Sequence, residues 1–206
     1  MNRKAPAPMT ATASCATGGS PGSPSAGPAS AWHREHVQFA RLLDFLDDRM
    51  ADFQSGGEPD YGLLRDAVCY LTQYADRFHH PREDAAFFRL AERDAGMLAP
   101  VRELLQEHRV IAFIGDRLLR MLEDAVSDAA IERDLLEAVA STFLVYYRHH
   151  LSREEAEILP RVARLLTAED WAQVAAAVPV AADPLFSDEV EARFRDLRRL
   201  LETAQE

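Results

Sequence analysis

The amino-acid sequence predicts an all-α protein: an antiparallel, up-down-up-down four-helix bundle with short extra helices at its C-terminal end. Three observations predict this fold class. Apolar residues recur at helical spacing through four long segments. Short stretches containing glycine, serine or aspartate separate these segments, and short loops favour antiparallel neighbours. No segment shows the apolar-polar alternation of a half-buried strand.

The first 30 residues differ in composition from the rest of the chain. Residues 1–30 consist almost wholly of Ala, Pro, Ser, Gly and Thr, which bury too little apolar surface to offset the entropy of ordering. We therefore expect a disordered tail there. The first long helix then runs from Trp32 to about Phe53, and the stretch Gln54-Ser55-Gly56-Gly57 ends it.

The second long helix contains a proline. Its apolar positions begin near Tyr61, and Asp60 is available to cap the first turn. Pro81 removes one backbone donor, so we expect a kink or a brief break after His80 before the helix resumes. Gly96 is expected to end this segment.

Two more long helices complete the predicted bundle. The third begins near Pro100, a residue suited to a first helical turn, and runs to about Ala125. The fourth begins at Ile131 and continues toward Leu166. The bundle is therefore expected to occupy residues 31–166.

Residues 167–206 are expected to form a C-terminal helical extension. Thr167 and Asp170 have the spacing of a capping box that opens a short helix. Ser187 is a candidate cap for a final helix that reaches Leu201.

Composition argues against several classes of partner and site. The chain has 206 residues and a formal net charge of -11, with no separate cluster of Lys and Arg, so nucleic acid and membrane surfaces are poor partners. Only Cys15 and Cys69 are present, which provide neither a disulfide framework nor a cysteine zinc site. No apolar segment has the length of a signal-peptide core or a membrane span. We expect a soluble, cytoplasmic protein.

The histidines and glutamates reveal an internal repeat. All seven histidines fall into four clusters, one on each long helix. On the second and fourth helices a histidine is followed four residues later by a glutamate, as His79 with Glu83 and His150 with Glu154. The offset is 72 residues from His36 to His108 and 71 from His79 to His150. The sequence therefore contains two similar helical hairpins.

Helix geometry brings these residues to one level. Residues four apart lie on one face of a helix, about 6 Å apart along its axis. The first helix extends about 17 residues from His36 to its end, and the second returns over about 18 residues to His79. The second hairpin has matching lengths. We therefore expect six residues to meet in one layer of the bundle: His36, His79, Glu83, His108, His150 and Glu154.

Imidazole and carboxylate groups together suggest a metal site. They suit iron, manganese or zinc, whereas calcium and magnesium prefer mostly oxygen ligands. The choice favours iron, because a closed tetrahedral zinc site would not need two paired glutamates. Two metal ions with six protein ligands leave open positions for water, oxygen or nitric oxide. The positive charge left after two Fe(III) ions meet two carboxylates favours an oxo or hydroxo bridge.

Over Trp32 to Leu166 the chain resembles the hemerythrin-like HHE cation-binding family. The resemblance rests on both His-to-Glu pairs, on the two Glu-His pairs that open the hairpins, and on the Leu159-Pro160 ending. It implies a non-haem di-iron centre in which His36 and His79 serve one iron, His108 and His150 serve the other, and Glu83 and Glu154 bridge the two. The pattern departs from oxygen-carrying hemerythrin, which has a fifth histidine and an aspartate bridge. It is closer to the iron-centre repair proteins and iron-sensing domains of the family.

Three functions fit these observations. The leading interpretation is a protein that binds or senses oxygen, nitric oxide or iron in stress responses, with a small diatomic molecule as its ligand. The second is a di-iron enzyme that acts on peroxide or nitric oxide or repairs iron centres. The third is a metal-stabilised interaction module with an unknown protein partner. No glycine-rich phosphate loop, nucleophile elbow or CxxC redox motif points elsewhere.

Three histidines stay outside the six-residue set. His33 is the strongest of them, because it precedes His36 by three residues and shares its helix face. His80 is rotated about 100° from His79 on an α-helix, so both are not expected to face the bundle axis. His149 has no special feature. Four tyrosines could line the site or donate hydrogen bonds, although core filling is the commoner role: Tyr70, Tyr74, Tyr146 and Tyr147.

Overall fold

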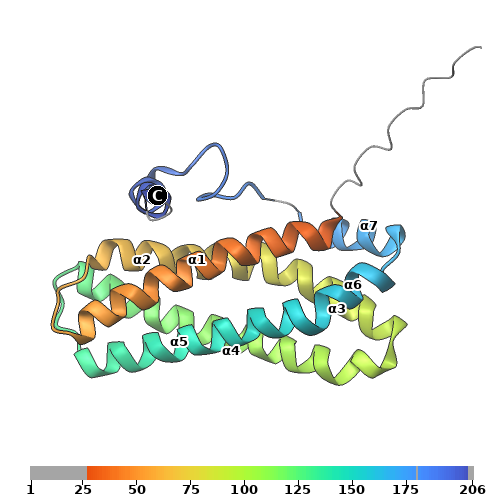
Figure 1. The fold of residues 1–206 in the computed structure, drawn as a ribbon, viewed down its shortest axis with the longest axis horizontal. Helices are drawn as coiled ribbons and strands as arrows, with labels where there is room; N and C mark the ends of the chain where they lie inside the picture. Colours follow the sequence, from red (N-terminus) through yellow and green to blue (C-terminus); the bar gives the residue numbers. More distant parts are fainter. Residues whose placement is uncertain (1–26, 180, 204–206) are drawn as a thin grey trace, which may run out of the picture.

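The computed structural model describes residues 27–179 and 181–203, and within those ranges the chain is helical with no strand. The long helical segments pack side by side along one axis (Figure 1). The turns after the first and third segments lie at one end of the bundle, and the turn after the second lies at the other (Figure 1). The predicted antiparallel four-helix bundle is confirmed.

The first long helix is α1 (Pro28–Gln54), which begins earlier than the predicted Trp32. Gly27 precedes it, and Pro28 occupies the first turn, where its missing N–H group is not needed. Residues 28–30 of the expected tail are therefore helical, while residues 1–26 lie outside the described residues. After the helix ends, Gly56 adopts a left-handed φ of 92°, which glycine tolerates without steric cost.

Three consecutive elements form the second long helix: α2 (Tyr61–Tyr70), the π-helical segment η1 (Leu71–His79) and α3 (His80–Arg93). The Asp60 carboxylate accepts a hydrogen bond from the Leu63 N–H group, as the sequence predicts. The helix does not break at Pro81. The wider turns of η1 end at His79 instead, so Pro81 lies in the first turn of α3, where proline is tolerated.

The second hairpin is built in a similar way. Its elements are η2 (Ala95–Met97), α4 (Leu98–Val126), α5 (Arg133–Arg153), the π-helical segment η3 (Glu154–Ile158) and α6 (Leu159–Leu165). Pro160 again lies in the first turn of the α-helix that follows a π-helical segment. The two π-helical segments do not occupy equivalent positions in the repeat, because η1 ends at His79 whereas η3 begins at Glu154.

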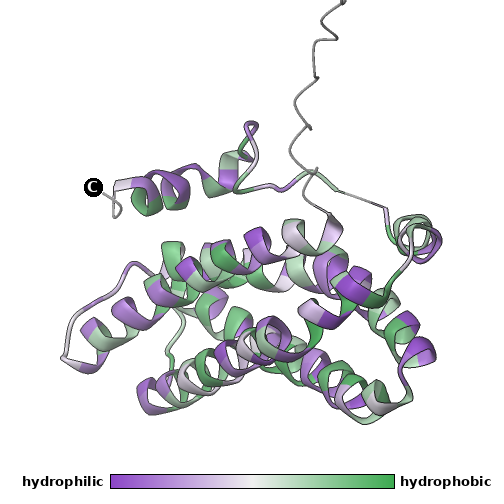
Figure 2. Ribbon diagram, turned by 45° about the vertical axis from the view of Figure 1, so that its right-hand side comes forward, coloured by the Kyte–Doolittle hydropathy of each residue, from purple (hydrophilic) through white to green (hydrophobic). Residues whose placement is uncertain are grey.

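Two apolar clusters fill the bundle, one on each side of a polar layer. On α1, Phe39 belongs to one cluster and Trp32 to the other, and His36 lies between them. His108 divides the apolar residues of α4 in the same way. Figure 2 shows hydrophobic positions along the inward sides of the helices. The apolar clusters therefore shield the polar layer from solvent at both ends.

The C-terminal region adds short helices: α7 (Ala168–Ala177), η4 (Ala192–Phe194) and α8 (Arg195–Thr203). Thr167 and Asp170 form the predicted capping box. The predicted cap at Ser187 is wrong, because its hydroxyl donates to the Glu189 carbonyl and the last helix starts later. α8 packs against α2, and buried side chains such as Leu197 extend the bundle core.

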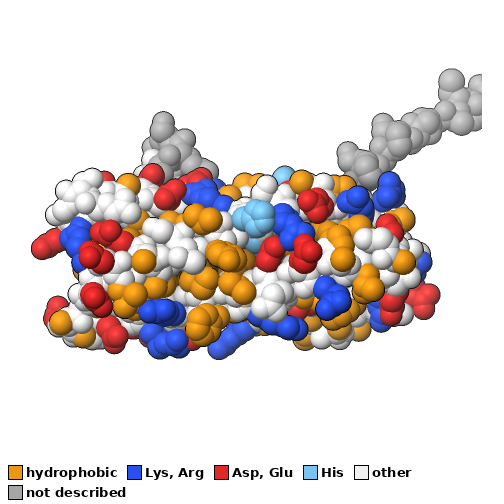
Figure 3. Space-filling view, turned by 90° about the horizontal axis from the view of Figure 1, so that it is seen from below, with side chains coloured by type: hydrophobic (Ala, Val, Ile, Leu, Met, Phe, Trp, Pro, Cys, Tyr) orange, Lys and Arg blue, Asp and Glu red, His pale blue; other side chains and the backbone are white. Residues whose placement is uncertain are grey.

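The surface carries charges of both signs. Acidic, basic and apolar side chains are interspersed over the face shown in Figure 3. Among the described helices, none combines the length and the apolar composition needed to cross a lipid bilayer.

Candidate metal centre

The six residues singled out in the sequence meet in one buried layer of the bundle. Each comes from a different element and is at most 6% exposed. They are His36 of α1, His79 of η1, Glu83 of α3, His108 of α4, His150 of α5 and Glu154 of η3. The matched helix lengths of the two hairpins explain why they reach the same level.

The Glu83 carboxylate lies between two groups of histidines. Its Oε1 atom is 3.1 Å from Nε2 of both His36 and His79. Its Oε2 atom faces the other group and is 3.7 Å from Nε2 of His108. The Nε2 atoms of His36 and His79 themselves converge to 2.9 Å. One oxygen of Glu83 therefore faces each group.

Glu154 has the equivalent position in the second hairpin. Its Oε1 atom lies 3.4 Å from Nε2 of His108 and 3.3 Å from Nε2 of His150. Its Oε2 atom lies 3.5 Å from Nε2 of His36. Both carboxylates therefore span the same gap between the two histidine groups.

His80 joins the cluster although the sequence pattern left it outside. Its side chain is 4% exposed, and one of its ring nitrogens lies within 4.8 Å of ligand atoms of Glu83, His108 and His150. A helix in a bundle buries an arc of about 100° or more. His79 can therefore meet His36 of α1 while His80 stacks on His108 of α4. The expectation that only one of the two adjacent histidines faces the interior is wrong.

Every histidine of the cluster has a carboxylate at Nδ1. A carboxylate accepts a hydrogen bond, so Nδ1 carries the proton and Nε2 faces the cluster, where it can bind a proton or a metal ion. The pairs are His36 with Glu155 at 2.8 Å, His79 with Glu35 at 2.5 Å, His80 with Asp76 at 3.0 Å, His108 with Asp84 at 2.7 Å, and His150 with Glu107 at 3.1 Å.

The sequence holds a signal for four of these acidic partners. Each directly adjoins a residue of the six-residue set, yet bonds a histidine on a different helix. Glu35, for example, precedes His36 but accepts a hydrogen bond from His79. Asp84 follows Glu83 but bonds His108. The repeated acidic neighbours could have been identified as partners of the histidines.

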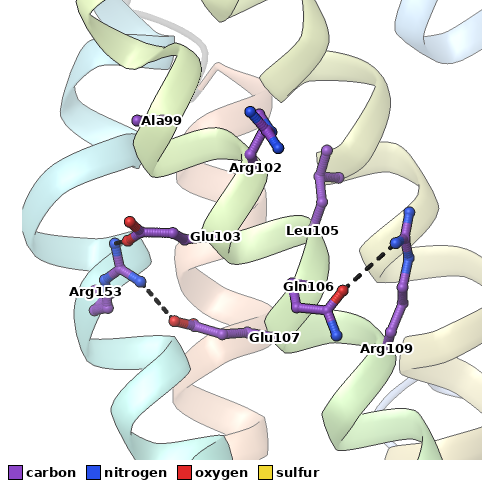
Figure 4. Close-up of a pocket in the computed structure, with 8 residues that line it drawn as sticks. All are labelled: Ala99, Arg102, Glu103, Leu105, Gln106, Glu107, Arg109 and Arg153. Atoms are coloured by element: carbon purple, nitrogen blue, oxygen red, sulfur yellow. Dashed lines mark hydrogen bonds and ion pairs between the residues drawn. The ribbon is translucent and has the colours of Figure 1, made fainter.

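Two arginines each hold one carboxylate of this outer layer. Arg82 donates to Glu35 at 2.7 Å, and Arg153 donates to Glu107 at 2.5 Å. Figure 4 shows Arg153 between Glu107 and Glu103. These residues line an open hollow of about 700 Å³ over α4, which contains none of the cluster histidines. The arginines fix Glu35 and Glu107, and these two acids in turn orient the rings of His79 and His150.

The charges of the cluster shift the pKa values of its groups. Burial lowers the pKa of His36, but hydrogen bonds with Glu155 and Glu83 outweigh it and raise the pKa to about 10. For His108, too, burial lowers the pKa, and neighbouring carboxylates raise it to about 10. Burial raises the pKa of Glu83, yet the adjacent imidazoles hold it well below the usual range. In the metal-free protein, protons on His36 and His108 therefore offset negative charge of the buried carboxylates.

The cluster contains unpaired polar atoms that a cation would satisfy. Leaving a buried polar atom without a partner costs about 1–3 kcal/mol. Among the described residues, seven buried side-chain atoms have no hydrogen-bond partner, and the cluster provides six of them: Nε2 of His80, His108 and His150, Oε2 of Glu83, and both carboxylate oxygens of Glu154. Imidazole and carboxylate donors suit iron, manganese or zinc. The residues present therefore fit a metal centre.

A groove of about 330 Å³ gives access to the cluster between α3 and α4. Both His80 and His108 line it. Asp76, Asp84 and Ala112 also contribute to its walls. The groove offers a path by which an ion or a small molecule can reach the buried histidines.

The remaining histidines lie away from the cluster. The His33 side chain is 60% exposed and its Nδ1 atom contacts Glu155 at 2.9 Å, so it reaches an outer carboxylate but not the buried layer. His149 is exposed. Of the tyrosines, Tyr146 is exposed, whereas Tyr147 is buried beside the cluster.

Comparison with known proteins identifies a family. The family model described as Hemerythrin HHE cation binding domain matches residues 27–162, which is 136 of the 206 residues. The matched range contains all seven cluster residues. No curated protein matches the chain.

Proposed function

Because the chain belongs to the hemerythrin HHE cation-binding domain family, we propose that residues 31–166 form a non-haem di-iron bundle. The observation that carries the proposal is the buried cluster of five imidazoles and two carboxylates, in which six atoms lack a hydrogen-bond partner. Residues 167–206 are assigned to a C-terminal extension outside this site.

The proposed ligand set follows the two histidine groups. His36 and His79 would hold one iron, and His80, His108 and His150 the other. Glu83 and Glu154 would bridge the two ions. The proposal is supported by the carboxylate oxygens, because each glutamate directs one oxygen at each group. An oxo or hydroxo bridge would complete the set.

We propose that the protein binds or senses a small diatomic molecule, oxygen or nitric oxide, in a cytoplasmic stress response. Iron bound here would supply open coordination positions for such a molecule. The group of His36 and His79 has one imidazole fewer than the other group. His80 brings the number of imidazoles to five and the donor set closer to that of oxygen-carrying hemerythrin.

Anaerobic loading with Fe(II) tests this proposal. The purified protein should retain close to two irons per chain, and its absorption spectrum should change when oxygen or nitric oxide is added. A variant of the exposed His149, His149→Ala, should behave like the unaltered protein. Retention of less than one iron per chain, or a spectrum that neither gas changes, would contradict the proposal.

An enzyme acting on peroxide or nitric oxide is the second candidate. The groove lined by His80 and His108 favours it, because it gives a small substrate access to the cluster. Peroxide or nitric oxide turnover by the iron-loaded protein, well above that of an equal amount of free iron, would favour catalysis over simple binding.

A further inference from the structure

The Tyr147 hydroxyl is the seventh buried side-chain atom without a hydrogen-bond partner among the described residues, and the one that lies outside the cluster. The Tyr147 side chain is fully buried and packs against Phe39 and Phe143. A phenylalanine would fill the same space, and a buried hydroxyl without a partner destabilises the fold. Packing alone therefore does not explain why this position has a hydroxyl group.

Tyr147 adjoins the proposed iron site. Its ring centroid is 6.0 Å from that of His80 and 6.5 Å from that of His150. The carboxylates of Asp76, Glu83 and Glu154 also act on it electrostatically. Both neighbouring histidines have unpaired Nε2 atoms. The ring that carries the unpartnered hydroxyl thus lies beside two histidines whose Nε2 atoms are also unpartnered.

The internal repeat explains why this hydroxyl has no protein partner. Tyr147 follows Asp76 by 71 residues, the offset that relates the two His-to-Glu pairs. The Asp76 carboxylate accepts a hydrogen bond from Nδ1 of His80, but the residue equivalent to His80 in the second hairpin is Leu151. The second hairpin therefore has no imidazole equivalent to that of His80. It has the Tyr147 hydroxyl, a hydrogen-bond donor, where the first hairpin has the Asp76 carboxylate, an acceptor.

From these observations we infer that Tyr147 donates a hydrogen bond to an anionic or diatomic ligand held at the cluster. The inference rests on the proposed function, because iron must be present to hold such a ligand. A phenol has an ordinary pKa of about 10, so at neutral pH the Tyr147 hydroxyl carries the proton that it donates. Its apolar surroundings strengthen a hydrogen bond of this kind. Tyr147 is thus a positioning residue for the added ligand and not for iron.

The variant Tyr147→Phe tests this role, with azide as the probe. Both proteins are loaded with iron, and azide is titrated while its visible absorption band is followed. Iron content should stay the same, whereas the azide dissociation constant should rise about tenfold or more, as for the loss of a hydrogen bond to a charged group. The vibrational frequency of bound azide should shift between H₂O and D₂O in the unaltered protein but not in the variant.

Tyr70→Phe is the matched control. Tyr70 is also fully buried, but its hydroxyl donates to Asp183 at 2.8 Å. This control should keep normal azide affinity. In the metal-free proteins, Tyr147→Phe should unfold at the same denaturant concentration as the unaltered chain or a higher one, because no bond is lost. Tyr70→Phe should unfold at a lower concentration.

The outcomes separate the two proposals. Unchanged azide affinity and an unchanged isotope shift in iron-loaded Tyr147→Phe would overturn the inference and leave the di-iron assignment intact. Failure of the unaltered protein to retain iron would overturn the proposed function, and this inference with it. A lower denaturation midpoint for metal-free Tyr147→Phe would reveal a structural partner for the hydroxyl, which also overturns the inference.

Discussion

His80 and His108 stack face to face, with ring centroids 4.2 Å apart and ring planes 17° apart. They come from neighbouring helices, and an aspartate anchors the Nδ1 atom of each ring. The stack places a third imidazole beside His150, while His36 and His79 form a group of two. The two proposed iron positions are therefore unequal.

Replacing His80 should weaken metal binding at one position. His80→Leu installs the residue type that Leu151 provides at the equivalent place in the repeat. We expect affinity for one of two ions to fall by more than the roughly 10–100-fold typical of outer-layer partners. Stepwise Co(II) or Fe(II) titration measures this loss. His149→Leu is the control, and equal behaviour of the two variants would remove His80 from the ligand set.

Glu107 should matter for metal affinity although it would not touch the metal. It bonds both His150 and Arg153, whereas Glu103 bonds Arg153 and no histidine. Glu107→Gln should lower metal affinity by about 10–100-fold, because the ring of His150 loses its charged partner. Competition with a chelator of known affinity provides the measurement. Glu103→Gln should have little effect, and a similar loss in both variants would point to Arg153 as the cause.

The metal-free protein should become less stable as the pH rises above neutrality. The pKa of His36 and of His108 is raised to about 10 in the folded protein, against an unfolded value of about 6.5. Their contribution is complete below pH 6.5 and is lost as the pH rises toward 10. In chelator, the free energy of unfolding should fall by at least about 1 kcal/mol between pH 7 and pH 9.5.

Metal loading should abolish this loss of stability at high pH. A bound metal ion replaces the protons on Nε2, so metal affinity rises with pH and the loaded protein keeps its stability at pH 9.5. Denaturant titrations of loaded and metal-free protein at both pH values test the pair of predictions. A metal-free protein that is equally stable at the two pH values would contradict the charge balance described for the cluster.

Filling the groove between α3 and α4 should slow metal uptake. Ala112 contributes to its wall, so Ala112→Phe places an aromatic ring in the path to His80 and His108. Stopped-flow loading with Co(II) should be slower, with the same final metal content. Ala99→Phe is the control, because Ala99 lines the separate hollow over α4. Equal loading rates would show that ions reach the cluster by another path.

Gly115 should tolerate no side chain. A Cβ atom there would lie 2.7 Å from Thr72 Cγ2 and 2.9 Å from Phe143 Cε2, both closer than normal contact. Alanine favours helices more than glycine does, but overpacking typically costs about 1–3 kcal/mol. Gly115→Ala should therefore lower the free energy of unfolding in urea titrations. A gain in stability would show that η1 and α5 can move away from α4.

Much of the bundle could be predicted because its signals are local and repeated. The apolar period defines four helices, and the 71-residue offset relates His79 to His150. Because the two helices of each hairpin have matching lengths between the turn and their histidines, the histidines reach one level of the bundle. Helix ends were less predictable: Pro28 begins α1 inside a composition typical of disorder, because proline suits a first turn.

His80 and the π-helical segments could not be predicted in the same way. His80 would be excluded only if a helix directed one narrow stripe of residues at the bundle axis. In this bundle the second helix contacts both α1 and α4, so its two adjacent histidines each find a partner. The helix type around Pro81 depends on tertiary packing, which no local pattern of residues reveals.

The outer layer of acids imposes an order of assembly on the site. Five carboxyl groups surround the histidines and two more lie among them, while Arg82 and Arg153 supply two guanidinium groups. Such surroundings repel an incoming anion until a cation has displaced the protons. Azide should therefore not bind the metal-free protein. Because a metal ion displaces protons from the imidazoles, loading the protein with metal in weak buffer should acidify the solution before any ligand can bind.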